Sequence, residues 1–191
     1  MIVKNKRPVS NSITVAACLL LAAALLFTSC AGKEEIVPEV NSRGYKEVTT
    51  IGMTLQWKFA GSNLELIVKA PTTGWVGVGF DPDSAMKGAS FIIGYVKDGE
   101  AIIADHYGDA LTDHVSDESL GGSSDVTLIG GSETGGSTEL NFSIPVGSTD
   151  EYDRKLSAGS KHKVLLAYGP KDDFETEHED KNKRTSIEIE L

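Results

Sequence analysis

Short runs that alternate apolar and polar side chains follow one another from residue 53 to the end, and this pattern restricts the fold most. Three examples are MTLQWKF (53–59), NLELIVKA (63–70) and WVGVGF (75–80). A period of two is typical of β-strands that bury one face, and glycine-containing turns separate the runs. Six more runs share the pattern, at residues 89–96, 100–107, 125–131, 138–144, 162–169 and 186–191.

These runs predict an all-β fold, an antiparallel immunoglobulin-like β-sandwich of about nine to ten strands. In the third run Val76, Val78 and Phe80 share one face, while Gly77 and Gly79 lie on the other. Glycines along one face of a strand let another group approach the backbone closely. The longest irregular segments run from residue 108 to 124 and from 170 to 184, and long loops on such a scaffold often carry function.

The N-terminal 29 residues differ from the rest of the chain. A basic start is followed by the apolar stretch ITVAACLLLAAALLF and by FTSC, which ends at Cys30. This succession resembles the lipobox of bacterial lipoproteins, and the resemblance implies cleavage before Cys30 and acylation of its thiol. The alternative is an uncleaved membrane anchor, for which the apolar stretch is short. The predicted organisation is a signal peptide (1–29), a polar tether (30–44) and one β-sandwich domain (45–191).

Composition narrows the possible partners. The net charge of −10 argues against nucleic-acid binding, which needs a basic face. Cys30 would be the only cysteine after cleavage, so no disulfide framework is expected. An acylated Cys30 would make the lipid bilayer a partner. The Lys33-Glu34-Glu35 sequence resembles surface-export signals, so we expect a lipid-anchored protein of the bacterial envelope, at the outer membrane or cell surface.

One methionine stands in an unusual place. Met86 lies in the polar loop of GWVGVGFDPDSAMKGASFIIGYV (74–96), although methionine normally fills apolar cores. The G-W-x-x-x-G-F strand, the Met-x-G-Ala step and the strand after it resemble the DOMON family. IADHYGDALTDH (103–114), the segment 137–169 and ETEHEDKNKRTSIEI extend the resemblance over nearly all of residues 45–191. That family is named for the N-terminal region of dopamine β-monooxygenase and includes the cytochrome domain of cellobiose dehydrogenase.

The resemblance implies a cofactor site. One branch of the family binds haem b through a methionine in this loop and a histidine before the final strand, positions that fall on Met86 and His178. Thioether and imidazole ligands together give low-spin iron that transfers electrons. Without the resemblance, Met86 would be read as a cover over the core and His178 as a solvated residue. His106 and His114 are the alternative iron ligands, and His162 is expected at the surface.

Two sequence details bear on how a cofactor would be bound. Many haem-binding members carry an arginine on the strand near residue 142, where this chain reads NFSIPV, so a propionate contact would fall to Lys87, Lys181 or Arg184. Asp81 and Asp83 also have a calcium-like spacing, but they lack the rest of an EF-hand loop. The interpretation that these segments favour is a membrane-tethered, haem b-binding electron-transfer protein with an unknown redox partner protein.

Other functions stay open at this point. No hydrolase, nucleotide-binding or zinc-protease motif is present, so we expect no enzyme. The alternative is a surface lipoprotein that binds a sugar or another small ligand without redox function. Trp57, Trp75, Tyr95 and Tyr107 are candidate stacking surfaces for such a ligand. A purely structural lipoprotein is a third possibility.

Overall fold

The computed structural model describes residues 36–191, which belong to one compact unit. The predicted signal peptide and Cys30 therefore lie outside the described residues. No helix within 36–191 has the length and apolar character needed to span a bilayer. The elements are β1 (Glu39–Val40), β2 (Lys46–Thr50), β3 (Met53–Ala60), β4 (Asn63–Ala70), β5 (Val76–Phe80), β6 (Ser90–Lys97), β7 (Glu100–Tyr107), β8 (Val115–Ser116), α1 (Asp117–Leu120), β9 (Thr127–Thr134), β10 (Ser137–Pro145), β11 (Lys161–Tyr168), η1 (Lys181–Lys183) and β12 (Arg184–Glu190).

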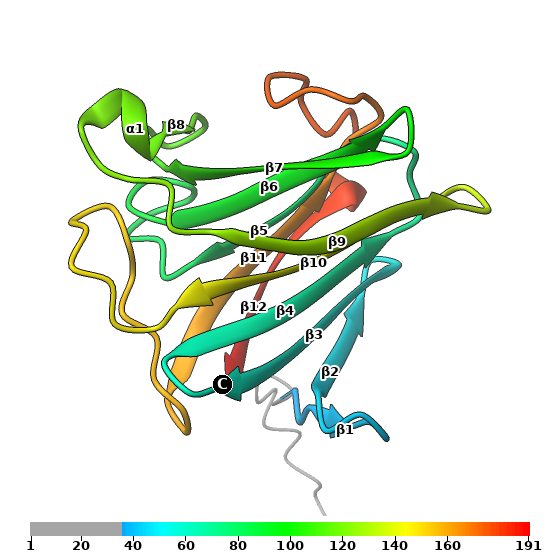
Figure 1. Ribbon diagram of the computed structural model, residues 1–191. Coiled ribbons are helices and arrows are strands. Elements are labelled where there is room, and N and C mark those ends of the chain that lie inside the picture. The colour runs from blue at the N-terminus through cyan, green and yellow to red at the C-terminus, as the bar shows by residue number, and fades with distance from the viewer. Residues whose placement is uncertain (1–35) are drawn as a thin grey trace, which may run out of the picture. The chain divides into compact units, whose positions relative to one another are not determined.

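The strands form two six-stranded antiparallel sheets that face each other as a sandwich (Figure 1), as the sequence predicts. The order in the first sheet is β1-β2-β3-β4-β10-β9, and in the second it is β12-β11-β5-β6-β7-β8. All nine alternating runs coincide with strands, but the described residues hold twelve strands rather than nine or ten. The additional strands are β1, β2 and β8, of which β1 falls in the predicted tether and β8 in the irregular segment 108–124.

The strand β2 was missed because its turn has an unusual sequence. A two-residue turn joins β2 to β3, and both of its residues have positive φ, 48° at Ile51 and 79° at Gly52. Such turns match the twist of a hairpin, but they normally carry Asn or Asp in front of the glycine. A β-branched residue in the left-handed region is rare, so Ile51 gave no turn signal.

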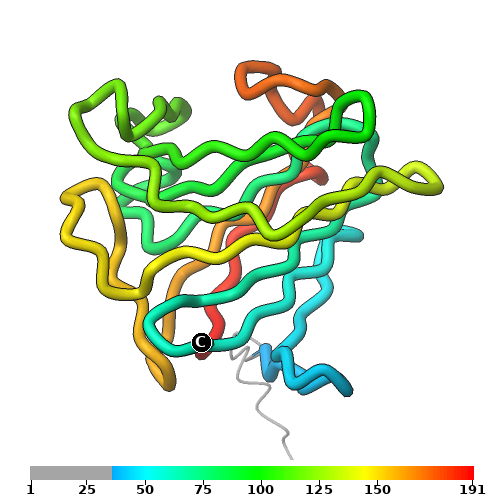
Figure 2. The backbone as a smooth tube through the Cα atoms, in the orientation of Figure 1, coloured from blue at the N-terminus to red at the C-terminus, as the bar shows by residue number. Residues whose placement is uncertain are grey.

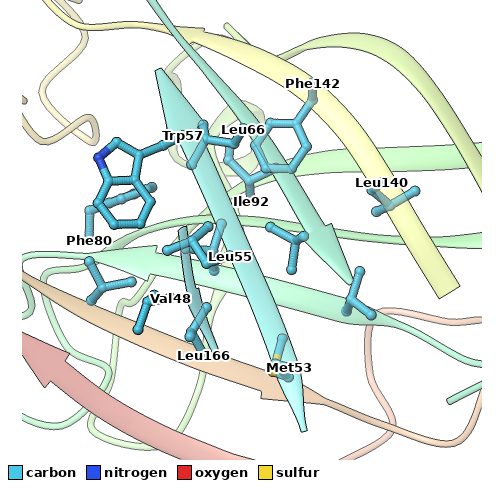
Figure 3. Close-up of a cluster of buried hydrophobic side chains, with 14 of the residues drawn as sticks. Val48, Met53, Leu55, Trp57, Leu66, Phe80, Ile92, Leu140, Phe142 and Leu166 are labelled. Carbon is cyan, nitrogen blue, oxygen red and sulfur yellow. The ribbon is translucent and has the colours of Figure 1, made fainter. Parts of the chain in front are cut away.

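The core lies between the two sheets and contains the faces that the alternation predicts. Leu55 and Trp57 of β3, Leu66 of β4 and Phe80 of β5 are almost fully buried there (Figure 3). Phe142 of β10, a further strand of the first sheet, belongs to the same cluster. Since burial of one apolar face of each sheet is the main favourable contribution to folding, this pairing of faces fixes the strand register.

The other face of the second sheet carries the candidate site. Ile92 of β6 points into the core, so its neighbours Phe91 and Ile93 point to the opposite face. On β7 the partner of Phe91 is His106, and the partner of Tyr95 is Ile102. The segments 108–124 (green) and 170–184 (orange) both lie beyond β7 in Figures 1 and 2. This face is therefore bordered by the two longest loops.

Candidate functional site

The Met86 loop is a tight turn held by backbone hydrogen bonds. Ser84 and Lys87 form an isolated bridge, and Ala85 between them has a φ of 51°. The Met86 N–H donates to the Leu111 carbonyl at 3.2 Å, and Gly88 donates to Gly108 at 2.7 Å. These bonds tie the loop to the chain that leaves β7. Met86 itself is half-buried, so its side chain is neither a core residue nor free in solvent.

The loop that carries His178 is fastened to the start of β5. The Trp75 indole Nε1–H donates to the Thr176 carbonyl at 2.7 Å, and the Trp75 backbone N–H donates to Lys171 at 3.0 Å. Thr176 also donates to Asp173 through its N–H and its hydroxyl. His178 is half-buried, and its Nδ1 is inaccessible to solvent and has no hydrogen-bond partner. A buried imidazole nitrogen without a hydrogen-bond partner is uncommon, and a functional role is one explanation for it.

Aromatic rings gather beside the His178 loop. Phe174, from the His178 loop, packs against Tyr95 at a ring-centroid distance of 5.0 Å and against His106 at 5.6 Å. On the side of the Met86 loop, His114 packs against Phe91 at 5.7 Å. His106 and His114 meet through their Nδ1 atoms at 2.7 Å, so one ring donates a proton and the other accepts it. These rings form one aromatic patch, to which the His178 loop contributes Phe174: Phe91, Tyr95, His106, His114 and Phe174.

Burial keeps this histidine pair neutral. Desolvation is the main cause that lowers the pKa of His106 to about 4, and the neighbouring His114 lowers it further. Desolvation also lowers the pKa of His114, although Asp113 and Asp109 oppose the shift. Neutral imidazoles are the form that binds iron. The alternative ligands His106 and His114 therefore lie in a suitable protonation state, but their Nδ1 atoms already bind each other.

Two glycines let side chains of this chain approach the backbone closely. A Cβ on Gly79 would collide with the Phe91 ring, and a Cβ on Gly88 would collide with Asp83 and Arg154. The space above these glycines is thus filled by this chain's own side chains. The stacking hypothesis needs correction, because Trp57 and Trp75 are buried, while Tyr95 and Tyr107 are half-buried.

One further expectation is wrong, and one alternative finds no support. His162 is buried rather than at the surface, and its Nδ1 bonds to Asp81 Oδ2 at 2.6 Å. Asp83 instead pairs with Arg154 at 2.8 Å. Asp81 and Asp83 therefore have different partners, so the calcium-like spacing of this turn does not bring two free carboxylates together.

A polar hollow of about 510 Å³ lies away from the aromatic patch. Its lining includes Asn63, Ser123, Asp125, Ser143 and Asp150, and it contains no aromatic side chain. Sugar sites usually combine hydrogen-bonding groups with an aromatic surface. This hollow offers only the first of these two elements.

Comparison with known proteins agrees with the sequence resemblance. The family model for the DOMON domain matches residues 50–169, which is more than half of the chain. This chain belongs to the DOMON family. A curated relative, DBH-like monooxygenase protein 2 of Mus musculus, is 32% identical over 125 residues, which are 62% of this chain. Those residues span 19% of the relative, so this DOMON chain covers about a fifth of that protein's length.

Two solved structures that share the fold are cytochrome domains. The cytochrome domain of Myriococcum thermophilum cellobiose dehydrogenase aligns with a TM-score of 0.59 at 12% identity, over 81% of this chain and 88% of that one. The cytochrome b domain of Coprinopsis cinerea pyranose dehydrogenase aligns with a TM-score of 0.55 at 12% identity, over 80% and 86%. At such low identity the likeness establishes the shared fold.

Sequence reasoning found Met86, His178, His106 and His114 as candidate ligands and Tyr95 as a stacking surface, but it missed Phe91 and Phe174 of the aromatic patch. Phe174 lies in a charged segment, far in sequence from the histidine that it contacts. The one available signal was that a phenylalanine within a polar loop needs an apolar surface to cover.

Proposed function

We propose that this DOMON protein binds one haem b, which Met86 and His178 would hold through the iron, and that it transfers electrons without catalysing a reaction of its own. The single observation that carries the proposal is the buried, unpartnered Nδ1 of His178 in a loop fastened beside an aromatic patch. Family membership and the cytochrome titles of the structural neighbours support the same cofactor.

The residues of this chain would bind, orient and shield the cofactor. Haem iron, when bound, would accept and return one electron. His178 would be the stronger ligand and Met86 the weaker one, which favours a higher potential than two imidazoles would give. The rings of Phe91 and Phe174 would exclude water from the iron, and exposed Lys181 and Arg184 would neutralise the propionates.

The experiment is a comparison of haem retention between histidine variants. The purified protein is mixed with one equivalent of haem and passed through gel filtration, and the haem that stays bound is measured. We expect one haem per chain, nearly complete loss in His178→Ala, and retention in His114→Ala. Retention in His178→Ala together with loss in His106→Ala or His114→Ala would refute the ligand assignment.

Sugar binding without redox function is the weaker candidate. The polar hollow has no aromatic surface on which a sugar ring could stack. If the purified protein takes up no haem, the electron-transfer proposal fails, and sugar-array screening becomes the next experiment.

We also propose that the chain is a lipoprotein of the bacterial envelope, attached to the bilayer through Cys30. The support is the basic, apolar and FTSC succession in the sequence. Intact-mass measurement of the native protein should show loss of residues 1–29 and added acyl mass. A mature N-terminus at another residue, without acyl mass, would refute the anchor.

A further inference from the structure

Three carboxylates converge at a second place, on the core side of β7. Asp105 of β7, Asp117 at the start of α1 and Asp153 in the segment before β11 each offer an oxygen, and these oxygens lie within 4.8 Å of one another. Asp105 points inward because its strand partner, Ile92, belongs to the core. Three segments far apart in sequence thus bring acidic groups to one buried point.

These carboxylates are buried and incompletely bonded. The exposed fraction of the whole residue is 3% for Asp105 and 0% for Asp117. Asp105 Oδ1, both oxygens of Asp117 and Asp153 Oδ2 are inaccessible and have no hydrogen-bond partner. Among the other oxygens, Asp105 Oδ2 accepts from the Asp125 N–H at 3.0 Å, and Asp153 Oδ1 accepts from the Ser90 hydroxyl at 3.5 Å. Four of the six carboxylate oxygens of the cluster therefore have no hydrogen-bond partner.

No positive side chain balances this charge. Within residues 36–191, none of the three carboxylates lies within ion-pair distance of a lysine, arginine or histidine. Arg154, next to Asp153 in sequence, instead bonds to Asp83 and to the Gly88 carbonyl. The surroundings add negative charge, since Asp125 and Asp150 lie beside the cluster. Burial of unpaired charges costs several kcal/mol per ion, so the native protein must neutralise them.

The geometry points to a calcium site, and we propose that one Ca²⁺ binds between Asp105, Asp117 and Asp153. Calcium takes six to eight oxygen ligands at about 2.3–2.6 Å, so two ligand oxygens on one ion lie at most about 4.6–5.2 Å apart. The spacing of the three carboxylates falls within this span. An all-oxygen set without imidazole or thiolate favours a hard cation over a transition metal.

The ion would fasten two loops to the second sheet. Asp117 belongs to the segment that also carries His114, and Asp153 belongs to the segment before β11. These two segments already meet where the Tyr152 hydroxyl donates to the Leu120 carbonyl and where Asp150 accepts from the Ser123 N–H. Calcium would thus stabilise the fold whether or not haem is bound, and the inference does not depend on the proposed electron transfer.

Protonation is the competing way to neutralise the cluster. Desolvation, together with repulsion from neighbouring aspartates, raises the pKa of Asp105 to about 8 and that of Asp117 to about 7. Two protonated carboxyls could share hydrogen bonds without any metal. The experiment must therefore separate calcium binding from proton binding.

The test uses the purified protein after chelator treatment, at pH 7.5, without haem. Calcium chloride is titrated in while melting temperature and bound calcium are measured, with magnesium chloride in parallel. We expect one calcium per chain and a rise in melting temperature of about 5–10 °C when calcium reaches a hundred times its dissociation constant. Magnesium should give less than half of this rise, because it dehydrates reluctantly and needs a tighter octahedral site.

The decisive variant is Asp117→Asn, with Asp153→Asn as a second test and Asp98→Asn as the control. Asp98 lies in the exposed turn between β6 and β7, where φ is 53°, a conformation that asparagine tolerates. Asp117→Asn should melt at a higher temperature than the parent in chelator, because it removes one repelling charge, and should lose the calcium response. Asp98→Asn should keep that response.

Two results would overturn the calcium site. One is an equal calcium response in the parent, Asp117→Asn and Asp153→Asn. The other is a parent protein that binds no calcium at pH 7.5 but gains stability when the pH is lowered from 8 to 6, which would show that protons neutralise the cluster.

Discussion

The two tryptophans provide a sharp test of how the His178 loop is held. Trp75 donates its indole N–H to the Thr176 carbonyl, whereas the Trp57 indole N–H is buried without a partner. Their exposed fractions are 7% and 1%, so both rings are packed. Trp75→Phe and Trp57→Phe thus remove the same atoms from two sites that differ in one hydrogen bond.

The two substitutions are expected to reduce the free energy of unfolding by different amounts. The indole exceeds the phenyl ring by about 40 Å³, so the void alone costs about 1 kcal/mol at about 24 cal/mol per Å³. In Trp75→Phe the Thr176 carbonyl also loses its donor, which adds about 1–3 kcal/mol. In Trp57→Phe the loss of an unpartnered N–H relieves a similar penalty. We therefore expect about 2–4 kcal/mol of destabilisation for Trp75→Phe and about 1 kcal/mol or less for Trp57→Phe.

Urea unfolding and hydrogen exchange measure the two effects. Unfolding curves give the free energies, and exchange of amides in residues 171–178 reports whether the His178 loop has loosened. Trp75→Phe should accelerate exchange in this segment, while Trp57→Phe should leave it unchanged. Equal free-energy losses, or an unchanged exchange rate in the Trp75 variant, would refute the view that this bond holds the loop.

Two further predictions concern stability. Gly94→Ala should cost about 1–3 kcal/mol of stability in thermal unfolding, since a Cβ there would lie 2.5 Å from the Ile102 carbonyl and 2.6 Å from Leu140. The control Gly130→Ala has open space around it and should cost less than half as much. Equal costs for the two variants would contradict the packing around Gly94. Lys58 and Tyr45 bond to Glu65 and lower its pKa. Glu65→Gln should therefore reduce stability by up to about 1 kcal/mol at pH 7. Glu65 contributes stability above the ordinary carboxylate pKa and loses it as the pH falls through the folded pKa. The cost of Glu65→Gln should therefore shrink as the pH falls below the ordinary carboxylate pKa, and a cost that does not change with pH would contradict this assignment.

Alternating side chains were sufficient to predict most of the sheet structure. Nine strands and the buried faces of β3, β4 and β5 follow from period two, because each strand must bury one apolar face. The strand β2 could not be found in this way, since Ile51 in its turn has a conformation that the residue type disfavours. Short β1 and β8 carry too few residues to show a period.

Long-range contacts explain what else the sequence could not predict. The contact of His106 with Phe174 depends on how the second sheet and its last loop pack. The same limit applies to Asp105, Asp117 and Asp153, which come from three separate segments. Local spacing instead drew attention to Asp81 and Asp83, whose side chains bond elsewhere. The positions of Met86 and His178 were predicted from family resemblance, and their role as ligands stays a prediction.

The central claim is that haem iron is bound by Met86 and His178, and the optical spectrum of the haem-loaded protein tests it most directly. The protein with one equivalent of haem is recorded before and after reduction, alongside Met86→Ala. The account predicts a low-spin spectrum with a sharp α band on reduction, and a shift to high spin in Met86→Ala because the weaker ligand is lost. A high-spin parent spectrum, or one that Met86→Ala leaves unchanged, would contradict the claim.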